Sequence, residues 1–156
     1  MDHFEIDAAD KRILKALAED GRASIRDLSE RIGLSQTPLL RRVKRLERSG
    51  VITGYGARLD EKSLGKSISV YVAVTLAQQT EDSLKAFETE ISKAAEVMSC
   101  FLMTGGSDYM LRVIVGSLEE YEQFLTKKLT RTPGVAHIQS SFALREVIQR
   151  TSPPLA

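Results

Sequence analysis

Five basic side chains fall within one short stretch of the chain: Arg41, Arg42, Lys44, Arg45 and Arg48. On an α-helix, which turns by about 100° per residue, most of them point to one side and the apolar residues between them point to the other. Cationic groups arranged in this way neutralise DNA phosphates and release the counterions bound to them. The stretch therefore predicts a helix with one face on a core and a basic face toward double-stranded DNA.

Short polar residues begin the same predicted helix. Ser35 is a favourable N-cap, and Gln36 and Thr37 fill the first turn. When such a helix lies in a major groove, these side chains and Arg41 reach the edges of the bases. The full set of predicted DNA-contacting residues is Ser35, Gln36, Thr37, Arg41, Arg42, Lys44, Arg45 and Arg58.

The alternative is that these charges only solvate a surface helix. Between Ser35 and Arg58 there are six Lys or Arg residues and a single acid, Glu47, although the whole chain has a net charge of only +1. A solvated face normally mixes both signs, so the imbalance favours DNA. We expect Arg42 and Arg45 to contact phosphates rather than bases.

Two further helices are needed to hold this one in place. Ser24 and Asp27 resemble a capping box at the start of a helix that ends at Gly33, where glycine supplies the positive φ of a tight exit. Apolar residues at helical spacing between Ile6 and Leu17 predict another amphipathic helix, which ends at Gly21. Three helices of this size share one small core.

A wing and a linker are expected after the basic helix. Residues 51–58 combine two β-branched residues with two glycines and predict a short strand and a turn, a wing that brings Arg58 beside the DNA backbone. Residues 1–58 are thus predicted to form a winged helix-turn-helix DNA-binding domain. The polar segment 59–66 is predicted to be a linker.

Strand periodicity replaces helical periodicity in the second half of the chain. From Ile68 to Leu76, for example, apolar residues occupy every second position. The predicted elements are strand 68–76, helix 81–91, strand 97–104, strand 109–115, helix 118–129 and strand 135–147. This βαββαβ order is the ferredoxin-like arrangement, so residues 67–156 are predicted to form a second domain and the fold class to be α+β.

Several predicted strands carry apolar residues on both faces, although two helices cover only one face of a four-stranded sheet. Met98 and Cys100, for example, alternate with Phe101 and Met103. We expect a homodimer packed through the second face, which would present two basic helices to a pseudo-palindromic site. The alternative is that the linker and the amino-terminal helices cover this face within one chain.

Three segments of the chain together resemble the Lrp/AsnC family of leucine-responsive, or feast/famine, transcriptional regulators: IGLSQTPLLRRVKRLERSGVITGY, TGGSDYMLRV and TPGVAHIQ. The resemblance covers essentially the whole chain in order and spacing. It implies a winged helix-turn-helix, a ferredoxin-like ligand-sensing domain, dimers that assemble into octamers or other even-numbered rings, and an amino acid as effector. The implied effector-binding residues are Thr104, Gly105, Gly106, Ser107, Asp108 and Tyr109 in one loop, with Val135 and His137 in a second wall.

The chemistry of this loop suits an amino acid. Backbone N–H groups of Gly105 and Gly106 are donors for a carboxylate, and Asp108 is an acceptor for an ammonium group. The alternative is an ordinary hairpin, because Gly-Gly-Ser-Asp is turn chemistry in any protein and Asp108 is also able to cap backbone. The residues alone leave both readings open, and the side chain of the effector stays undetermined.

The sequence gives little support for catalysis, a metal or a cofactor. His137 stands apart from any Cys, His or carboxylate cluster at metal-ligand spacing, and the single Cys100 lies in the apolar stretch VMSCFLM. The acidic start MDHFEIDAADKR and the absence of a long apolar run predict a cytoplasmic protein with no membrane span.

The function predicted from these features is sequence-specific transcriptional regulation in response to a small effector. Two alternatives are an architectural protein that organises DNA without an effector, and an amino-acid-binding regulatory subunit of an enzyme. The ratio of specific to non-specific DNA affinity, measured at fixed salt, distinguishes a sequence-specific regulator from the architectural protein. In the second, the basic helix would be incidental.

Overall fold

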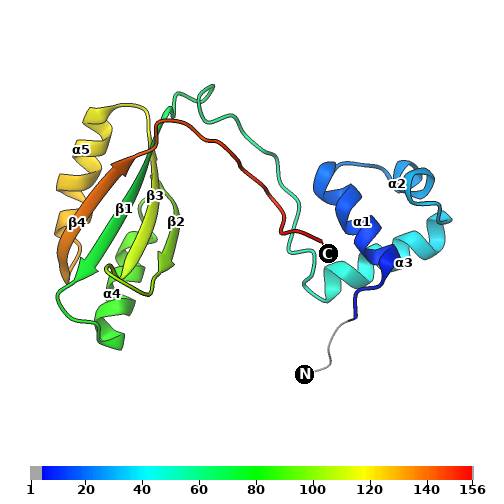
Figure 1. Ribbon diagram of the computed structural model, residues 1–156, viewed down its shortest axis with the longest axis horizontal. Coiled ribbons are helices and arrows are strands. Elements are labelled where there is room, and N and C mark those ends of the chain that lie inside the picture. Colours follow the sequence, from blue (N-terminus) through cyan, green and yellow to red (C-terminus); the bar gives the residue numbers. More distant parts are fainter. Residues whose placement is uncertain (1–4, 156) are drawn as a thin grey trace. The chain divides into compact units, whose positions relative to one another are not determined.

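The computed structural model describes residues 5–155, which divide into two compact units (Figure 1). One unit comprises the described residues up to Arg58 together with those from Ile148 onward, and the other is Leu59–Val147. No helix within residues 5–155 is long and apolar enough to cross a membrane.

The first unit contains three helices in its described part: α1 (Ala8–Glu19), α2 (Ile25–Ile32) and α3 (Gln36–Arg48). Ser24 caps α2 and exchanges hydrogen bonds with Asp27, as predicted, and Gly33 ends that helix at a φ of 74°. Asp7 caps α1 in the same way with Asp10. The three helices enclose one core of Ile13, Ala16, Leu28, Ile32, Leu39, Val43 and Leu46.

Residues 51–58 form an extended segment rather than the expected short strand, because no strand in the described part of this unit pairs with them. Val51 and Ile52 pack against the helical core, and the Ile52 N–H donates to the carbonyl of Leu46 over 3.1 Å. The Tyr55 hydroxyl donates to Glu47 over 2.9 Å. The segment therefore occupies the position of a wing after α3. Side-chain contacts and the Ile52 hydrogen bond hold it in place, and strand pairing does not.

The second unit has the predicted βαββαβ order. Its elements are β1 (Ile68–Leu76), α4 (Glu81–Ile91), β2 (Val97–Leu102), β3 (Tyr109–Val115), α5 (Leu118–Lys127), a short 3-10 helix η1 (Leu129–Arg131) and β4 (Val135–Phe142). The four strands form one sheet in the order β2-β3-β1-β4, with every neighbouring pair antiparallel. The ferredoxin-like prediction is confirmed.

Paired residues of the two central strands, β1 and β3, are buried on one face of this sheet. Val72 lies opposite Leu111, and both are fully buried. Phe87 of α4 and Phe124 of α5 belong to the same core. Both helices therefore cover the same face of the sheet.

The other face, here called the open face, carries Tyr71, Ala73, Phe101, Met110 and Arg112 on neighbouring strands. Phe101 is 60% exposed and Tyr71 is 44% exposed, although both are large and apolar. Helices α4 and α5 leave this face uncovered, as the sequence pattern predicted.

The last strand ends at Phe142 instead of continuing to Val147 as predicted. Its neighbour β1 begins at Ile68, and Phe142 already lies opposite Val70. One further hydrogen bond, from Ala143 N–H to the Ser69 carbonyl, closes the ladder. The residues before Ile68 do not belong to β1, so residues 144–147 have no strand partner and do not extend β4.

The predicted linker, residues 59–66, is held against the second unit. The Arg112 guanidinium donates to both carboxylate oxygens of Glu61, the shorter contact being 2.7 Å. The carbonyl oxygen of Gly65 lies 2.6 Å from where a Cβ would be at Gly116, so only glycine fits at residue 116. Most of the segment thus behaves as part of the second unit rather than as a free connection.

Candidate DNA-binding and effector-binding sites

The N-cap and the first two residues of α3 are accessible. Ser35, Gln36 and Thr37 are exposed, and Ser35 occupies the N-cap position without making a side-chain capping hydrogen bond. Arg41 and Lys44 are also exposed, and neither forms an ion pair within residues 5–155. These side chains are therefore positioned to contact a ligand outside the unit.

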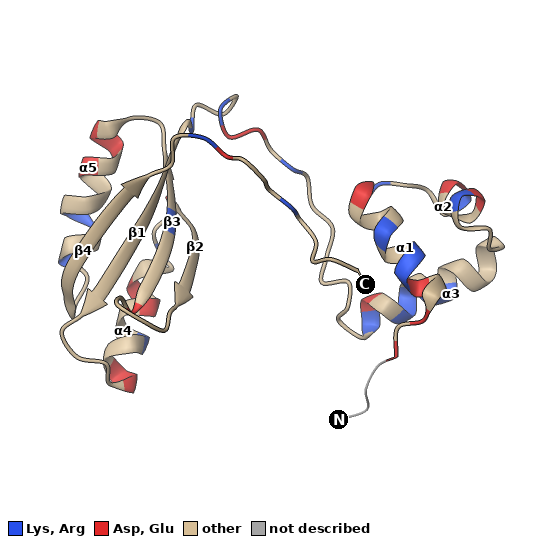
Figure 2. Cartoon of the chain, in the orientation of Figure 1, with Lys and Arg blue, Asp and Glu red and all other residues tan. Residues whose placement is uncertain are grey.

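Arg42 and Arg45, both predicted to contact phosphates, form ion pairs within the unit. The Arg42 guanidinium donates to Asp7 over 2.6 Å and to Asp10 over 2.9 Å, and Arg45 also donates to Asp10. Figure 2 shows acidic residues at the start of α1 near basic residues of α3. The hydrogen bond from the Asp10 backbone N–H, together with Arg42, lowers the pKa of Asp7 to about 2.

Asp10 is the residue that sequence reasoning missed. It is fully buried, and it accepts hydrogen bonds from the Asp7 backbone as well as from the two arginines. A signal was present in the sequence, because Asp10 lies four residues after Ile6 and three before Ile13, on the apolar stripe of α1. A carboxylate on such a stripe is buried on folding, and its burial is costly unless a cationic side chain pairs with it.

The predicted effector loop is fixed to the end of β1 through Asp108. The Asp108 carboxylate accepts the Leu76 backbone N–H over 2.7 Å, and the Asp108 N–H donates to the carbonyl of Val74 over 2.9 Å. The pairing of β1 with β3 ends at Val74 opposite Tyr109, so Asp108 satisfies the Leu76 donor just beyond that ladder. Thr104, Gly105 and Gly106 form the exposed tip of the loop.

The second predicted wall meets the loop at the same place. Val135 lies opposite Leu76, and the exposed His137 lies opposite Thr75. The Ala77 N–H donates to the carbonyl of Gly134 over 2.8 Å. The start of β3 and the start of β4 therefore flank the carboxyl-terminal end of β1, which brings the two predicted walls together.

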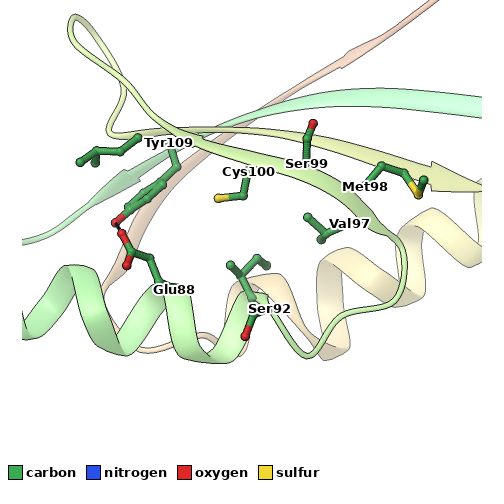
Figure 3. Close-up of a pocket in the computed structure, with 9 residues that line it drawn as sticks. Glu88, Ser92, Val97, Met98, Ser99, Cys100 and Tyr109 are labelled. Carbon is green, nitrogen blue, oxygen red and sulfur yellow. Dashed lines mark hydrogen bonds between the residues drawn. The ribbon is translucent and has the colours of Figure 1, made fainter. Parts of the chain in front are cut away.

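Tyr109 is oriented away from this junction. Its ring is 1% exposed, packs against Phe87 at 4.5 Å between ring centroids and donates its hydroxyl to Glu88 over 2.8 Å (Figure 3). Burial, followed by the Glu88 carboxylate, raises the pKa of the Tyr109 hydroxyl. Its side chain lines a cavity of about 340 Å³ between α4 and β2, together with Cys100, so it supports the loop from the helix-covered face.

Two family profiles match the two units in order. The profile described as winged helix-turn-helix DNA-binding matches residues 6–53, and the one described as Lrp/AsnC ligand binding domain matches residues 69–153. The chain belongs to the Lrp/AsnC family. It is therefore a DNA-binding transcriptional regulator, and its family is one of regulators rather than enzymes.

Curated relatives extend over the whole chain of this Lrp/AsnC regulator. It is 56% identical to the Bkd operon transcriptional regulator of Pseudomonas aeruginosa, over 97% of this chain and 99% of the relative. It is 40% identical to the leucine-responsive regulatory protein of Escherichia coli, over 93% of this chain and 88% of the relative. Neither comparison leaves a domain of the chain unmatched.

Solved structures of the Lrp/AsnC family have the same fold. A transcriptional regulator from Neisseria meningitidis, solved in complex with L-methionine, superposes with a TM-score of 0.93, at 36% identity and 97% coverage of each chain. The feast or famine regulatory protein of Mycobacterium tuberculosis, also complexed with L-methionine, gives a TM-score of 0.85 at 31% identity, covering 96% of this chain and 99% of that one.

Proposed function

We propose that this Lrp/AsnC regulator binds a free amino acid at the carboxyl-terminal end of β1 and changes its DNA binding in response. The observation that carries the proposal is the junction of the 104–108 loop with residues 134–137, both tied to the last residues of β1. Two relatives solved with L-methionine support an amino-acid effector. The name of the Escherichia coli relative supports an apolar one.

The junction offers the groups that a zwitterion needs. Backbone N–H groups at Gly105 and Gly106 are donors for the carboxylate, with the hydroxyls of Thr104 and Ser107 beside them. Asp108 gives one carboxylate oxygen to Leu76, which leaves the other as an acceptor for the ammonium group. Val135 supplies apolar surface and His137 a polar edge.

DNA is bound by the exposed face of α3. Ser35, Gln36, Thr37 and Arg41 contact base edges in the major groove, and Lys44 contacts phosphates. Arg58 is exposed at the end of the wing segment, where it reaches the backbone beside the groove. Arg45 contributes at the edge of this surface while it is bound to Asp10.

A homodimer formed through the open face presents two copies of α3 to the DNA, and such dimers assemble into an octamer or another even-numbered ring. The support is the exposure of Phe101 and Tyr71 on a face that α4 and α5 do not cover. The whole assembly acts on the chromosome, which places it in the cytoplasm.

Calorimetric titration of the full-length protein with each common amino acid tests the effector. We expect saturable binding of one or more apolar amino acids, with L-methionine and L-leucine tested first. Binding of none of them would remove the effector from the proposal and leave the DNA-binding function untouched.

A further inference from the structure

Asp7, Asp10, Arg42 and Arg45, here called the Asp10 clamp, join the start of α1 to the middle of α3. Asp10 has no exposed surface, whereas the side chains of Arg42 and Arg45 are 27% and 44% exposed. One Asp10 oxygen accepts from Arg42, and the other accepts from Arg45 and from the Asp7 N–H. A buried carboxylate is tolerated only when it is satisfied in this way.

The clamp divides the charges of α3 into two groups. Asp7, the N-cap of α1, and Asp10 offset Arg42 and Arg45, so the remaining positive side chains of α3 are Arg41, Lys44 and Arg48. The Arg42 Nη1 donates to both acids, which directs that side chain toward α1. On the helix, Arg42 is about 100° from Arg41, whereas Arg45 is only about 40° away.

We propose that Asp10 is a positioning residue for DNA binding: it fixes Arg42 as an internal support of α3 and holds Arg45 at the edge of the DNA-contacting face. This inference rests on the proposed role of that face. It assigns Arg42 to the fold and not to phosphate contact, and it limits the number of phosphates that α3 neutralises.

The consequence is selectivity. Phosphate contacts bind every sequence, and base contacts alone discriminate between sequences. The Asp10 clamp offsets the charge of two of the five basic side chains. The attraction of α3 to phosphates of any sequence is therefore weak relative to the base contacts of Gln36, Thr37 and Arg41. Release of Arg42 and Arg45 strengthens non-specific binding more than specific binding.

The experiment compares the salt dependence of DNA binding by full-length wild type and D10N, with E30Q as control. Asn keeps the size and the acceptor for the Asp7 N–H, and Glu30 belongs to an exposed pair with Arg26 in the same unit. The probes are a duplex selected by the wild type from a random library and an unselected duplex of equal length. Circular dichroism checks the fold.

For folded D10N we expect a salt slope steeper by about one and a several-fold lower ratio of specific to non-specific affinity, with E30Q like the wild type. An unchanged slope and ratio in folded D10N would overturn the proposal. Should D10N not fold, R42Q decides: an unchanged slope supports the proposal, and a slope shallower by about 0.9 overturns it. R41Q tests the proposed DNA-binding face separately, since an unchanged slope and affinity in R41Q would refute that face itself.

Discussion

The two roles of Asp108 can be separated by a single substitution. The Asp108 carboxylate supports the end of β1 through the Leu76 N–H at 2.7 Å, and in the proposed site it also receives the ammonium group of the effector. D108N keeps an oxygen that accepts the Leu76 N–H but removes the negative charge. D108A removes both. The pair of variants therefore tests structure and ligand binding independently.

The magnitudes follow from the bonds involved. A hydrogen bond to a charged group contributes about 1.5–3 kcal/mol, and each 1.4 kcal/mol is a factor of ten in affinity. We therefore expect D108N to raise the dissociation constant for the amino acid by about 10-fold to 150-fold while unfolding stability changes by less than about 1 kcal/mol. In D108A the Leu76 N–H loses its partner, which costs about 1–3 kcal/mol of stability.

Calorimetry with the amino acid that binds the wild type gives the affinities, and urea unfolding gives the stabilities. Wild-type affinity in D108N would refute the assignment of Asp108 to the ammonium group. Wild-type stability in D108A would refute its role in capping β1. E90Q is the matched control, since it removes the charge of an exposed carboxylate on α4 that pairs with Lys93 outside the proposed site.

Three further predictions concern the open face, the Asp10 clamp and the contact of residues 59–66 with the second unit. F101D should shift the protein from a dimer or higher assembly to a monomer in sedimentation velocity without unfolding it. L118D, at the similarly exposed Leu118 of α5, should leave the assembly unchanged. An unchanged assembly in F101D would exclude the open face as the interface. Because the pKa of Asp7 falls from 3.8 to about 2 on folding, its charge stabilises the fold above pH 3.8 and this stabilisation is lost as the pH falls through 2. The gap in urea midpoint between wild type and D7N should accordingly be constant above about pH 5 and close toward pH 2, and a gap independent of pH would contradict stabilisation of the Asp7 carboxylate by the Asp10 N–H and Arg42. G116A should cost about 1–3 kcal/mol in urea unfolding, because its Cβ would lie 2.6 Å from the Gly65 carbonyl oxygen, while G54A, with open space around it, should cost less; equal stabilities would show that residues 59–66 do not pack there.

The sequence allowed the fold to be predicted where local pattern and tertiary packing agree. Period-two alternation in β1, the Ser24 capping box and the turn at Gly33 each reflect a physical preference that the packed structure keeps. The end of β4 could not be predicted in this way. It depends on where its neighbour β1 begins, and residues 143–147 remain apolar enough to continue a strand.

The candidate sites were predictable by segment but not by side-chain orientation. The loop 104–108 and the wall at 134–137 meet only because the strand order places β3 and β4 on either side of β1. Tyr109 lies two residues before Leu111, so both side chains point to the same face of β3, which the helices cover. The pairing of Arg42 with Asp10 joins residues far apart in the chain, so charge counting along α3 alone could not detect it.

Coupling between the two proposed sites is the most direct test of the account. Binding of the selected DNA duplex is measured with and without saturating amino acid, and binding of the amino acid with and without the duplex. Linkage requires both affinities to change by the same factor, which we expect to be about 5-fold to 150-fold. An amino acid that binds the protein while the DNA isotherm stays the same would contradict an effector-responsive regulator.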